Sequence, residues 1–161
     1  MSDYGFGLPP RTGEALDLDA VWDLGDALDE AAQGRQVDAA LMTEIASSEG
    51  APVSHMYVAA GMDPELDWKV EHPVTFVVCT GECQSWSAVD RVQWLLDERA
   101  RRLKAGEPAF DIQSRGCLNA CDHPPAIMSH SSEGQALHAN ATPESLQEAI
   151  SVLVDGAELG D

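Results

Sequence analysis

All four cysteines of the chain lie between residues 79 and 121, where they form two pairs of equal spacing. The pairs are Cys79 with Cys83 and Cys117 with Cys121, and three residues separate the members of each pair. Four thiolates can ligate one zinc ion or one iron–sulfur cluster. Zinc sites and thioredoxin-type disulfide exchange favour two residues between paired cysteines, and the sequence has no such pair. The spacing therefore favours a 2Fe–2S cluster with two ligands for each iron, and it leaves a zinc ion, disulfides or free thiols as alternatives.

Each cysteine pair follows a short apolar segment that we expect to be a β-strand. Residues 74–79 are mostly large and apolar, as in a strand covered on both faces, and a shorter strand is expected at 109–113. Between them, residues 86–104 carry apolar side chains at helical spacing. A thiol at the end of a strand can turn toward a shared ligand, so two such loops side by side can offer four thiolates to one metal centre.

The residues after the second cysteine pair predict two more strands and a helix. Strands are expected at 126–128 and 135–138, with a turn between them. A helix is expected over 142–154, with Thr142 at its cap and Pro143 in its first turn. The elements then alternate as β-α-β followed by β-β-α, which is the pattern of a small thioredoxin-like α/β fold.

Ahead of this unit lies a segment that the sequence predicts to be helical. We expect helices at 17–33 and 38–48, followed by a partly helical connector that reaches residue 72. Residues 1–16 are rich in glycine, proline and polar residues and are expected to form a loose tail. The expected division is therefore a tail at 1–16, a helical extension with its connector at 17–72, and an α/β domain at 73–161.

The charge of the chain limits its partners. The sequence holds 28 acidic and 9 basic residues, a net charge of −19, with 15 acids and 3 bases in residues 1–71. This balance argues against binding to nucleic acids or anionic membranes. The sequence shows neither a signal peptide nor an apolar run of about 20 residues that could cross a bilayer. We therefore expect a cytoplasmic protein, in which paired cysteines are more often metal ligands or redox groups than structural disulfides.

Several motifs resemble the thioredoxin-like 2Fe–2S ferredoxin family. They are the residues 77–81 around the first cysteine, 116–122 around the second pair, Pro125 with the apolar strand after it, and 142–146 at the start of the last helix. The best-known member of that family is the small iron–sulfur subunit of NADH:quinone oxidoreductase (complex I), and related subunits serve NAD-linked formate dehydrogenases and hydrogenases. The complex I subunits usually have four residues between the first two cysteines, where this chain has three.

The resemblance implies a fold, a cofactor and a partner. It implies a thioredoxin-like 2Fe–2S ferredoxin domain with an N-terminal helical extension, and one 2Fe–2S cluster per chain. The implied ligands are Cys79, Cys83, Cys117 and Cys121. The chain would be a non-catalytic electron-transfer subunit of an NAD(P)H-dependent oxidoreductase, with an FMN- and NAD(P)H-binding flavoprotein subunit as its partner. The apolar faces of the N-terminal helices also allow the ferredoxin domain or a second copy of this chain to cover them. The non-catalytic role is expected because no arrangement of catalytic residues stands out. A stand-alone ferredoxin and a zinc-binding interaction module with four cysteine ligands are the alternatives.

Overall fold

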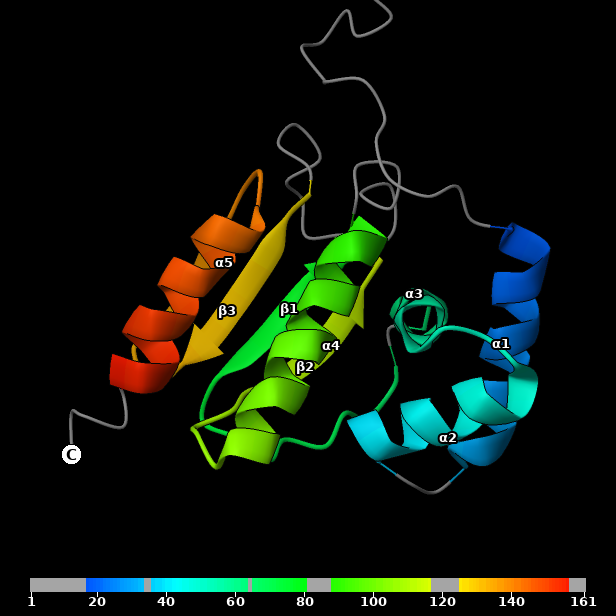
Figure 1. Ribbon diagram of the computed structural model, residues 1–161. Helices are drawn as coiled ribbons and strands as arrows, with labels where there is room; N and C mark the ends of the chain where they lie inside the picture. Colours follow the sequence, from blue (N-terminus) through cyan, green and yellow to red (C-terminus); the bar gives the residue numbers. More distant parts are fainter. Residues whose placement is uncertain (1–16, 34–35, 64, 81–87, 117–124, 157–161) are drawn as a thin grey trace, which may run out of the picture.

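The computed structural model describes residues 17–33, 36–63, 65–80, 88–116 and 125–156. The expected tail at 1–16 lies outside these ranges. The described part has a mixed α/β architecture in which three helices precede a four-stranded sheet (Figure 1). Among the described residues, no helix is both long and apolar enough to cross a membrane.

The sheet is built from a β-α-β unit followed by a β-β-α unit, as the sequence predicts. Its strands are β1 (Thr75–Cys79), β2 (Asp111–Arg115), β3 (Ile127–Ser131) and β4 (Gly134–His138), in the order β2-β1-β3-β4. β1 and β2 are parallel and are joined through α4 (Ala88–Ala105). β3 is antiparallel to both β1 and β4. β1 therefore lies inside the sheet, and all five of its residues are buried.

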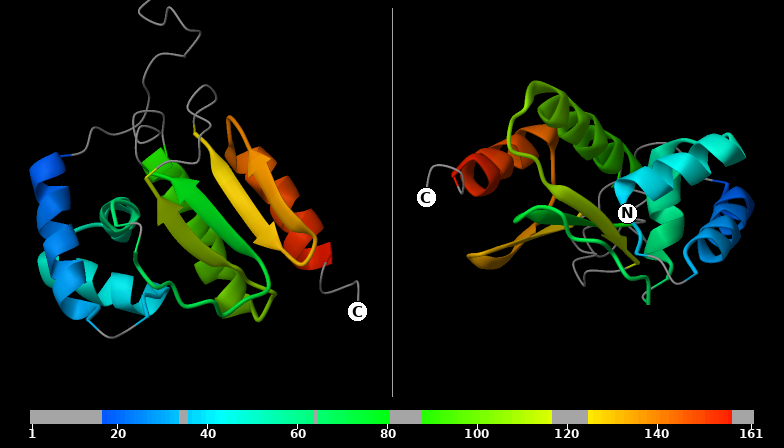
Figure 2. Two further views of the ribbon diagram at one scale, coloured as in Figure 1. Left: turned by 180° about the vertical axis from the view of Figure 1, so that it is seen from behind. Right: turned by 90° about the horizontal axis from the view of Figure 1, so that it is seen from below.

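Two helices cover the same face of this sheet (Figures 1 and 2). They are α4 and α5 (Pro143–Ile150), and α5 continues into the π-helical turn η3 (Ser151–Asp155). Thr142 caps α5 through a reciprocal pair of hydrogen bonds with Ser145, which confirms the helix start expected from the sequence. Phe76 and Phe110 meet edge to face in the hydrophobic core, with ring centroids 5.2 Å apart.

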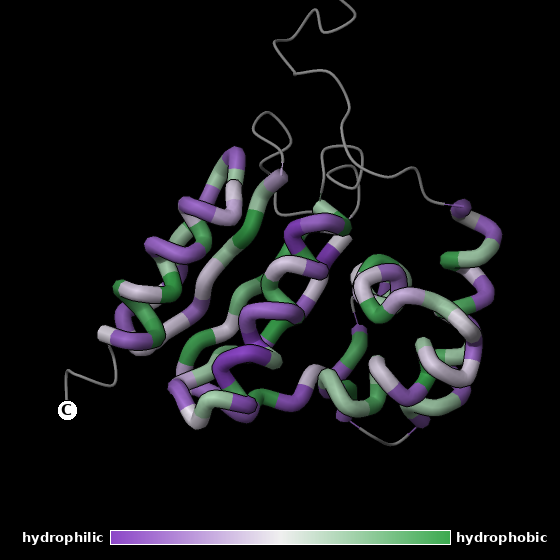
Figure 3. Tube along the Cα trace, viewed as in Figure 1, coloured by the Kyte–Doolittle hydropathy of each residue, from purple (hydrophilic) through white to green (hydrophobic). Residues whose placement is uncertain are grey.

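Three helices precede the sheet: α1 (Leu18–Ala31), α2 (Ala39–Glu49) and α3 (Val53–Gly61). Asp17 and Asp38 cap α1 and α2 by accepting hydrogen bonds from backbone N–H groups of the first turn. Along α1, hydrophilic and hydrophobic residues recur as expected for a helix with one buried face (Figure 3). α1 and α2 both pack on α3, which in turn contacts α4 and β2.

α3 joins the helical segment to the sheet, because its residues belong to the same hydrophobic core as the strands. The Ser114 hydroxyl on β2 donates a hydrogen bond to the carbonyl of Tyr57 on α3. The Tyr57 ring is buried and stacks on Trp68, with centroids 5.8 Å apart. α3 is therefore covered by the sheet and α4, and not only by the other two N-terminal helices. The expected domain boundaries themselves stay predictions.

Candidate metal centre

Cys79 is the cysteine whose position the structure describes, and it is the last residue of β1. Its side chain is 1% exposed, and its Sγ lies 3.9 Å from the carbonyl oxygen of Gly116, which follows β2. In the parallel pairing of β1 with β2, Cys79 stands opposite Arg115. The first cysteine therefore lies beside the point at which the chain enters the second cysteine loop.

Backbone hydrogen bonds hold this end of the sheet together on both sides of Cys79. The N–H of Thr80 donates to the Arg115 carbonyl at 2.8 Å, and the N–H of Cys79 donates to the Ala126 carbonyl at 3.0 Å. The described chain stops at Gly116 and resumes at Pro125. Because Gly116 and Ala126 both contact Cys79, the two ends of the second cysteine loop flank it. We call these contacts around Cys79, Thr80, Arg115, Gly116 and Ala126 the cysteine rim.

The other three predicted ligands, Cys83, Cys117 and Cys121, lie outside the described residues. Their positions relative to Cys79 therefore stay a prediction of the sequence. Within the described ranges, no group of three or more histidine, cysteine, aspartate or glutamate side chains is placed to hold a metal ion. Of the predicted metal centre, the structure thus describes one thiol and the contacts that hold it.

What the structure describes at the cysteine rim fits a centre ligated by thiolates. A buried thiol at the end of a strand is shielded from water on the sheet side and belongs to the soft ligands that zinc and iron–sulfur clusters prefer. Arg115, which stands opposite Cys79 in the pairing, is exposed and brings a positive charge to the same end of the sheet. That charge would offset part of the negative charge of a four-thiolate site.

A hollow of about 620 Å³ lies next to the cysteine rim, between the end of α3 and the end of β2. Half-buried Trp68 and exposed Met62 form its apolar wall. Arg115 and Gly116 line it too, and both belong to the cysteine rim. Its lining is completed by Gly61, Asp63, Leu66, Gln113 and Ser114. Sequence reasoning misses this hollow and Gly61, because residues 50–72 carry only the signals of a partly helical connector.

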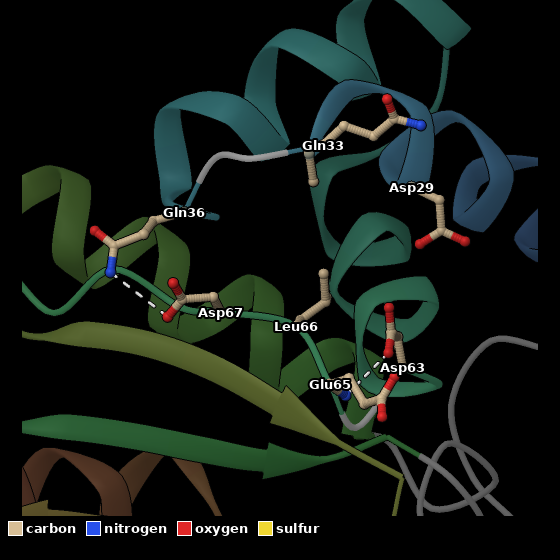
Figure 4. Close-up of a pocket in the computed structure, with 8 residues that line it drawn as sticks. Asp29, Gln33, Gln36, Asp63, Glu65, Leu66 and Asp67 are labelled. Carbon is tan, nitrogen blue, oxygen red and sulfur yellow. Dashed lines mark hydrogen bonds between the residues drawn. The ribbon is translucent and has the colours of Figure 1, made fainter.

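A second hollow, of about 480 Å³, is strongly acidic (Figure 4). It lies between α1 and the connector after α3, and its carboxylates are those of Asp29, Asp63, Glu65 and Asp67. The Gln36 side chain donates to Asp67 at 3.5 Å, and the N–H of Glu65 donates to Asp63 at 2.9 Å. Four of the 15 acidic residues in residues 1–71 therefore line one described surface.

A third hollow, of about 300 Å³, combines acidic and apolar side chains on α1 and α3. Trp22 is 60% exposed there, and Met62 is 39% exposed. The apolar floor comes from Val21, Leu28 and Ala59, and the acidic rim from Asp26, Asp29 and Asp63. We call this surface the Trp22 groove. Met62 and Asp63 line both this groove and the hollow beside the cysteine rim, so the two adjoin.

Comparisons with known proteins give little that bears on these sites. No protein-family model matches the chain, and no curated protein matches it. Among solved structures, the chain is similar to the thioredoxin-like [2Fe-2S] ferredoxin from Aquifex aeolicus, with 16% sequence identity and a TM-score of 0.38. That match covers 54% of this chain and 90% of the ferredoxin. A likeness of this size leaves fold and function to be argued from the chain's own residues.

Proposed function

We propose that this chain is an electron-transfer protein with a thioredoxin-like domain that holds one 2Fe–2S cluster. Cys79, Cys83, Cys117 and Cys121 would be its ligands. The observation that carries the proposal is the cysteine rim. There the first cysteine and both ends of the second cysteine loop lie together at one end of the sheet. The β-α-β and β-β-α order around a β2-β1-β3-β4 sheet supports the thioredoxin-like assignment.

The roles of the chain's own residues follow from their positions. Cys79 would supply a ligand on the shielded side of the centre, because strands β2 and β3 flank it. Arg115 would stabilise the negative charge of the thiolates from the exposed side. When bound, a 2Fe–2S cluster supplies a centre that accepts and releases one electron at a time. The chain would hold that centre and present it to a partner, without making or breaking bonds itself.

We further propose that the partner is an FMN-binding subunit that oxidises or reduces NAD(P)H, and that it docks on the Trp22 groove. An exposed tryptophan with apolar residues beneath it is the kind of anchor that protein interfaces bury. The carboxylates around the groove favour a partner surface that carries lysine and arginine. Because the groove adjoins the hollow at the cysteine rim, a partner seated on it would also lie near the cluster.

Metal and sulfide analysis tests the cluster. Protein purified without oxygen from iron-replete cells should be red-brown and contain iron and acid-labile sulfide in equal amounts. Cys79→Ala should abolish the spectrum, and Cys79→Ser should keep part of it, since an alkoxide can still ligate iron. Stoichiometric zinc without sulfide would contradict the proposal and assign a zinc module with four cysteine ligands instead.

Co-purification from the native cells tests the partner. A larger FMN-containing chain should accompany this protein, and Trp22→Ala should weaken their association. Val152→Ala is the matched control, because Val152 is 62% exposed on η3, at the far side of the molecule from α1 (Figure 1). Equal effects of both substitutions would contradict docking on the groove. A cluster-loaded protein without any flavoprotein partner would instead identify a stand-alone ferredoxin.

A further inference from the structure

Gly61, the last residue of α3, packs against the cysteine rim so closely that it leaves no room for a side chain. A Cβ atom built at position 61 would lie far inside van der Waals contact with the hydroxyl oxygen of Thr80, and 3.4 Å from two backbone atoms of Arg115. A Cβ at Gly116 would in turn lie 3.2 Å from the Gly61 carbonyl oxygen. The end of α3 therefore touches the first residue of one cysteine loop and the residue before the other.

Thr80 has little freedom to avoid such a Cβ atom. It is 2% exposed, and its N–H is held by the Arg115 carbonyl at 2.8 Å. Its hydroxyl lies 3.4 Å from the same carbonyl, to which it donates. Rotating the side chain would cost that hydrogen bond, and moving the backbone would move the adjacent Cys79.

α3 is equally unable to retreat from the rim. Ser114 on β2 donates its hydroxyl hydrogen to the Tyr57 carbonyl one turn before Gly61, and the Tyr57 ring is held by its stack on Trp68. Every described residue from Met56 to Gly61 is buried. An added methyl group at position 61 would therefore displace Thr80 rather than the helix, because interiors are packed too densely to absorb it.

We propose that Gly61 is a positioning residue for the metal centre: it lets the end of α3 hold Thr80 and Gly116, and with them the starts of both cysteine loops, at a fixed separation. This inference rests on the proposed cluster for its functional meaning. The contact itself concerns only this chain's residues and can be tested on the protein without any metal.

The experiment compares Gly61→Ala, Thr80→Ala and the double variant with the native chain. The matched control is Gly25→Ala in α1, where a Cβ atom would meet nothing within 4 Å. In metal-free protein, alkylation of Cys79 is followed by peptide mass spectrometry. In cluster-loaded protein, the EPR spectrum and the reduction potential are measured. Unfolding curves identify any variant that fails to fold.

We expect Gly61→Ala to speed alkylation of Cys79 by a factor of about three to ten, the size expected for loss of one hydrogen bond at the rim. It should also shift the EPR spectrum and the reduction potential. Removing the Thr80 hydroxyl should relieve the contact, so the double variant should return to the values of Thr80→Ala alone, and Gly25→Ala should match the native chain.

Native behaviour of Gly61→Ala in both assays would overturn the inference. So would a double variant that stays as perturbed, or as unfolded, as Gly61→Ala. If the native chain binds no cluster, the proposed function fails while the alkylation assay still decides whether Gly61 positions Cys79.

Discussion

The two ends of the β1–β2 pair are held together in different ways. At the cysteine rim the described contacts are backbone hydrogen bonds and close approaches of small residues, Gly61, Thr80 and Gly116. At the opposite end, buried charged side chains hold the chain. Asp111, 5% exposed at the start of β2, accepts hydrogen bonds from the N–H groups of Glu71 and His72 at 2.7 and 2.9 Å.

A second charged anchor lies at the C-terminal end of α4. The Arg102 guanidinium is almost fully buried and forms ion pairs with Glu98 and with Asp155 of η3, each at 2.8 Å. It also donates to the Pro108 carbonyl at 3.0 Å. These hydrogen bonds to Asp155 and Glu98 raise the pKa of Arg102. One guanidinium thus connects α4, the loop before β2 and the C-terminal helix.

Stability and metal chemistry therefore depend on opposite ends of the sheet. Buried charges stabilise a fold only where every partner is present, and a nearby fixed charge would alter the properties of a thiolate centre. Among the described residues, the ion pairs of Arg102 lie at one end of the sheet and Cys79 lies at the other. Substitutions at the charged end should therefore change stability, and substitutions at the rim should change the metal centre.

The largest effect on stability is expected from Arg102→Met. It removes hydrogen bonds to Glu98, to Asp155 and to the Pro108 carbonyl, and should lower the free energy of unfolding by about 3 kcal/mol, since hydrogen bonds to charged groups contribute about 1.5–3 kcal/mol each. Denaturant unfolding measures the loss. Arg101→Met is the matched control, since Arg101 also pairs with Glu98 but is half exposed, and its effect should be much smaller. Equal losses would show that the burial of Arg102 is unimportant.

Asp111→Ala should have the next largest effect. It leaves the N–H groups of Glu71 and His72 without their carboxylate acceptor, which should cost about 1.5–3 kcal/mol in unfolding free energy. Asp111→Asn keeps an acceptor oxygen and should recover part of that loss. If the two variants are equally unstable, the negative charge rather than the hydrogen bonds holds the connector to β2.

Cys79→Ala should give the reverse pattern at the rim. In metal-free protein the substitution removes one buried sulfur atom and should cost about 1 kcal/mol, a typical value for a point substitution. In the loaded protein it should abolish the cluster spectrum. Thermal unfolding of the metal-free variant and iron analysis of the loaded one separate the two effects. A loss as large as that of Arg102→Met would contradict the separation of stability from chemistry.

The smallest effect concerns pH and His138, whose ring nitrogen lies 3.0 Å from the Ser129 hydroxyl. Burial lowers the pKa of His138 below its ordinary value of about 6.5. The unfolded chain therefore binds the proton more readily than the folded chain, so stability should be greatest above about pH 6.5 and decline as the pH falls below it. His138→Gln should reduce this decline. Unfolding curves measured between pH 5 and 8 would check it, and an unchanged slope would contradict it.

The sequence predicts the order of the elements, because β1, α4 and α5 carry strong local signals. β2 is expected at 109–113 but begins two residues later, at Asp111, opposite Thr75. Its bounds depend on pairing with β1, which the local sequence does not encode. Nearly all residues of α3 are buried, so its sequence lacks the amphipathic period that marks a surface helix. For that reason the sequence predicts only a partly helical connector there.

At the candidate site, the sequence predicts which residues could ligate a metal but not the packing contacts that position them. The parallel strands place Cys79 beside the start of the second cysteine loop, as expected from two strand-end cysteine motifs. The contact of Gly61 with Thr80 joins two segments that are adjacent only in three dimensions, and a glycine inside a connector gives no sign of it. Close packing of that kind follows from the tertiary fold alone.

The central position of β1 has a consequence for how the chain folds as it is synthesised. β1 is uncharged and mostly apolar, and both strands that flank it follow it in the sequence. Its hydrogen bonds can therefore be completed only after α4, β2 and β3 have been synthesised. An unpaired apolar strand in a nascent chain is prone to aggregate. Residues 1–71, with 15 acids and 3 bases, leave the ribosome before the sheet, and their negative charge should keep nascent chains apart until their sheets form.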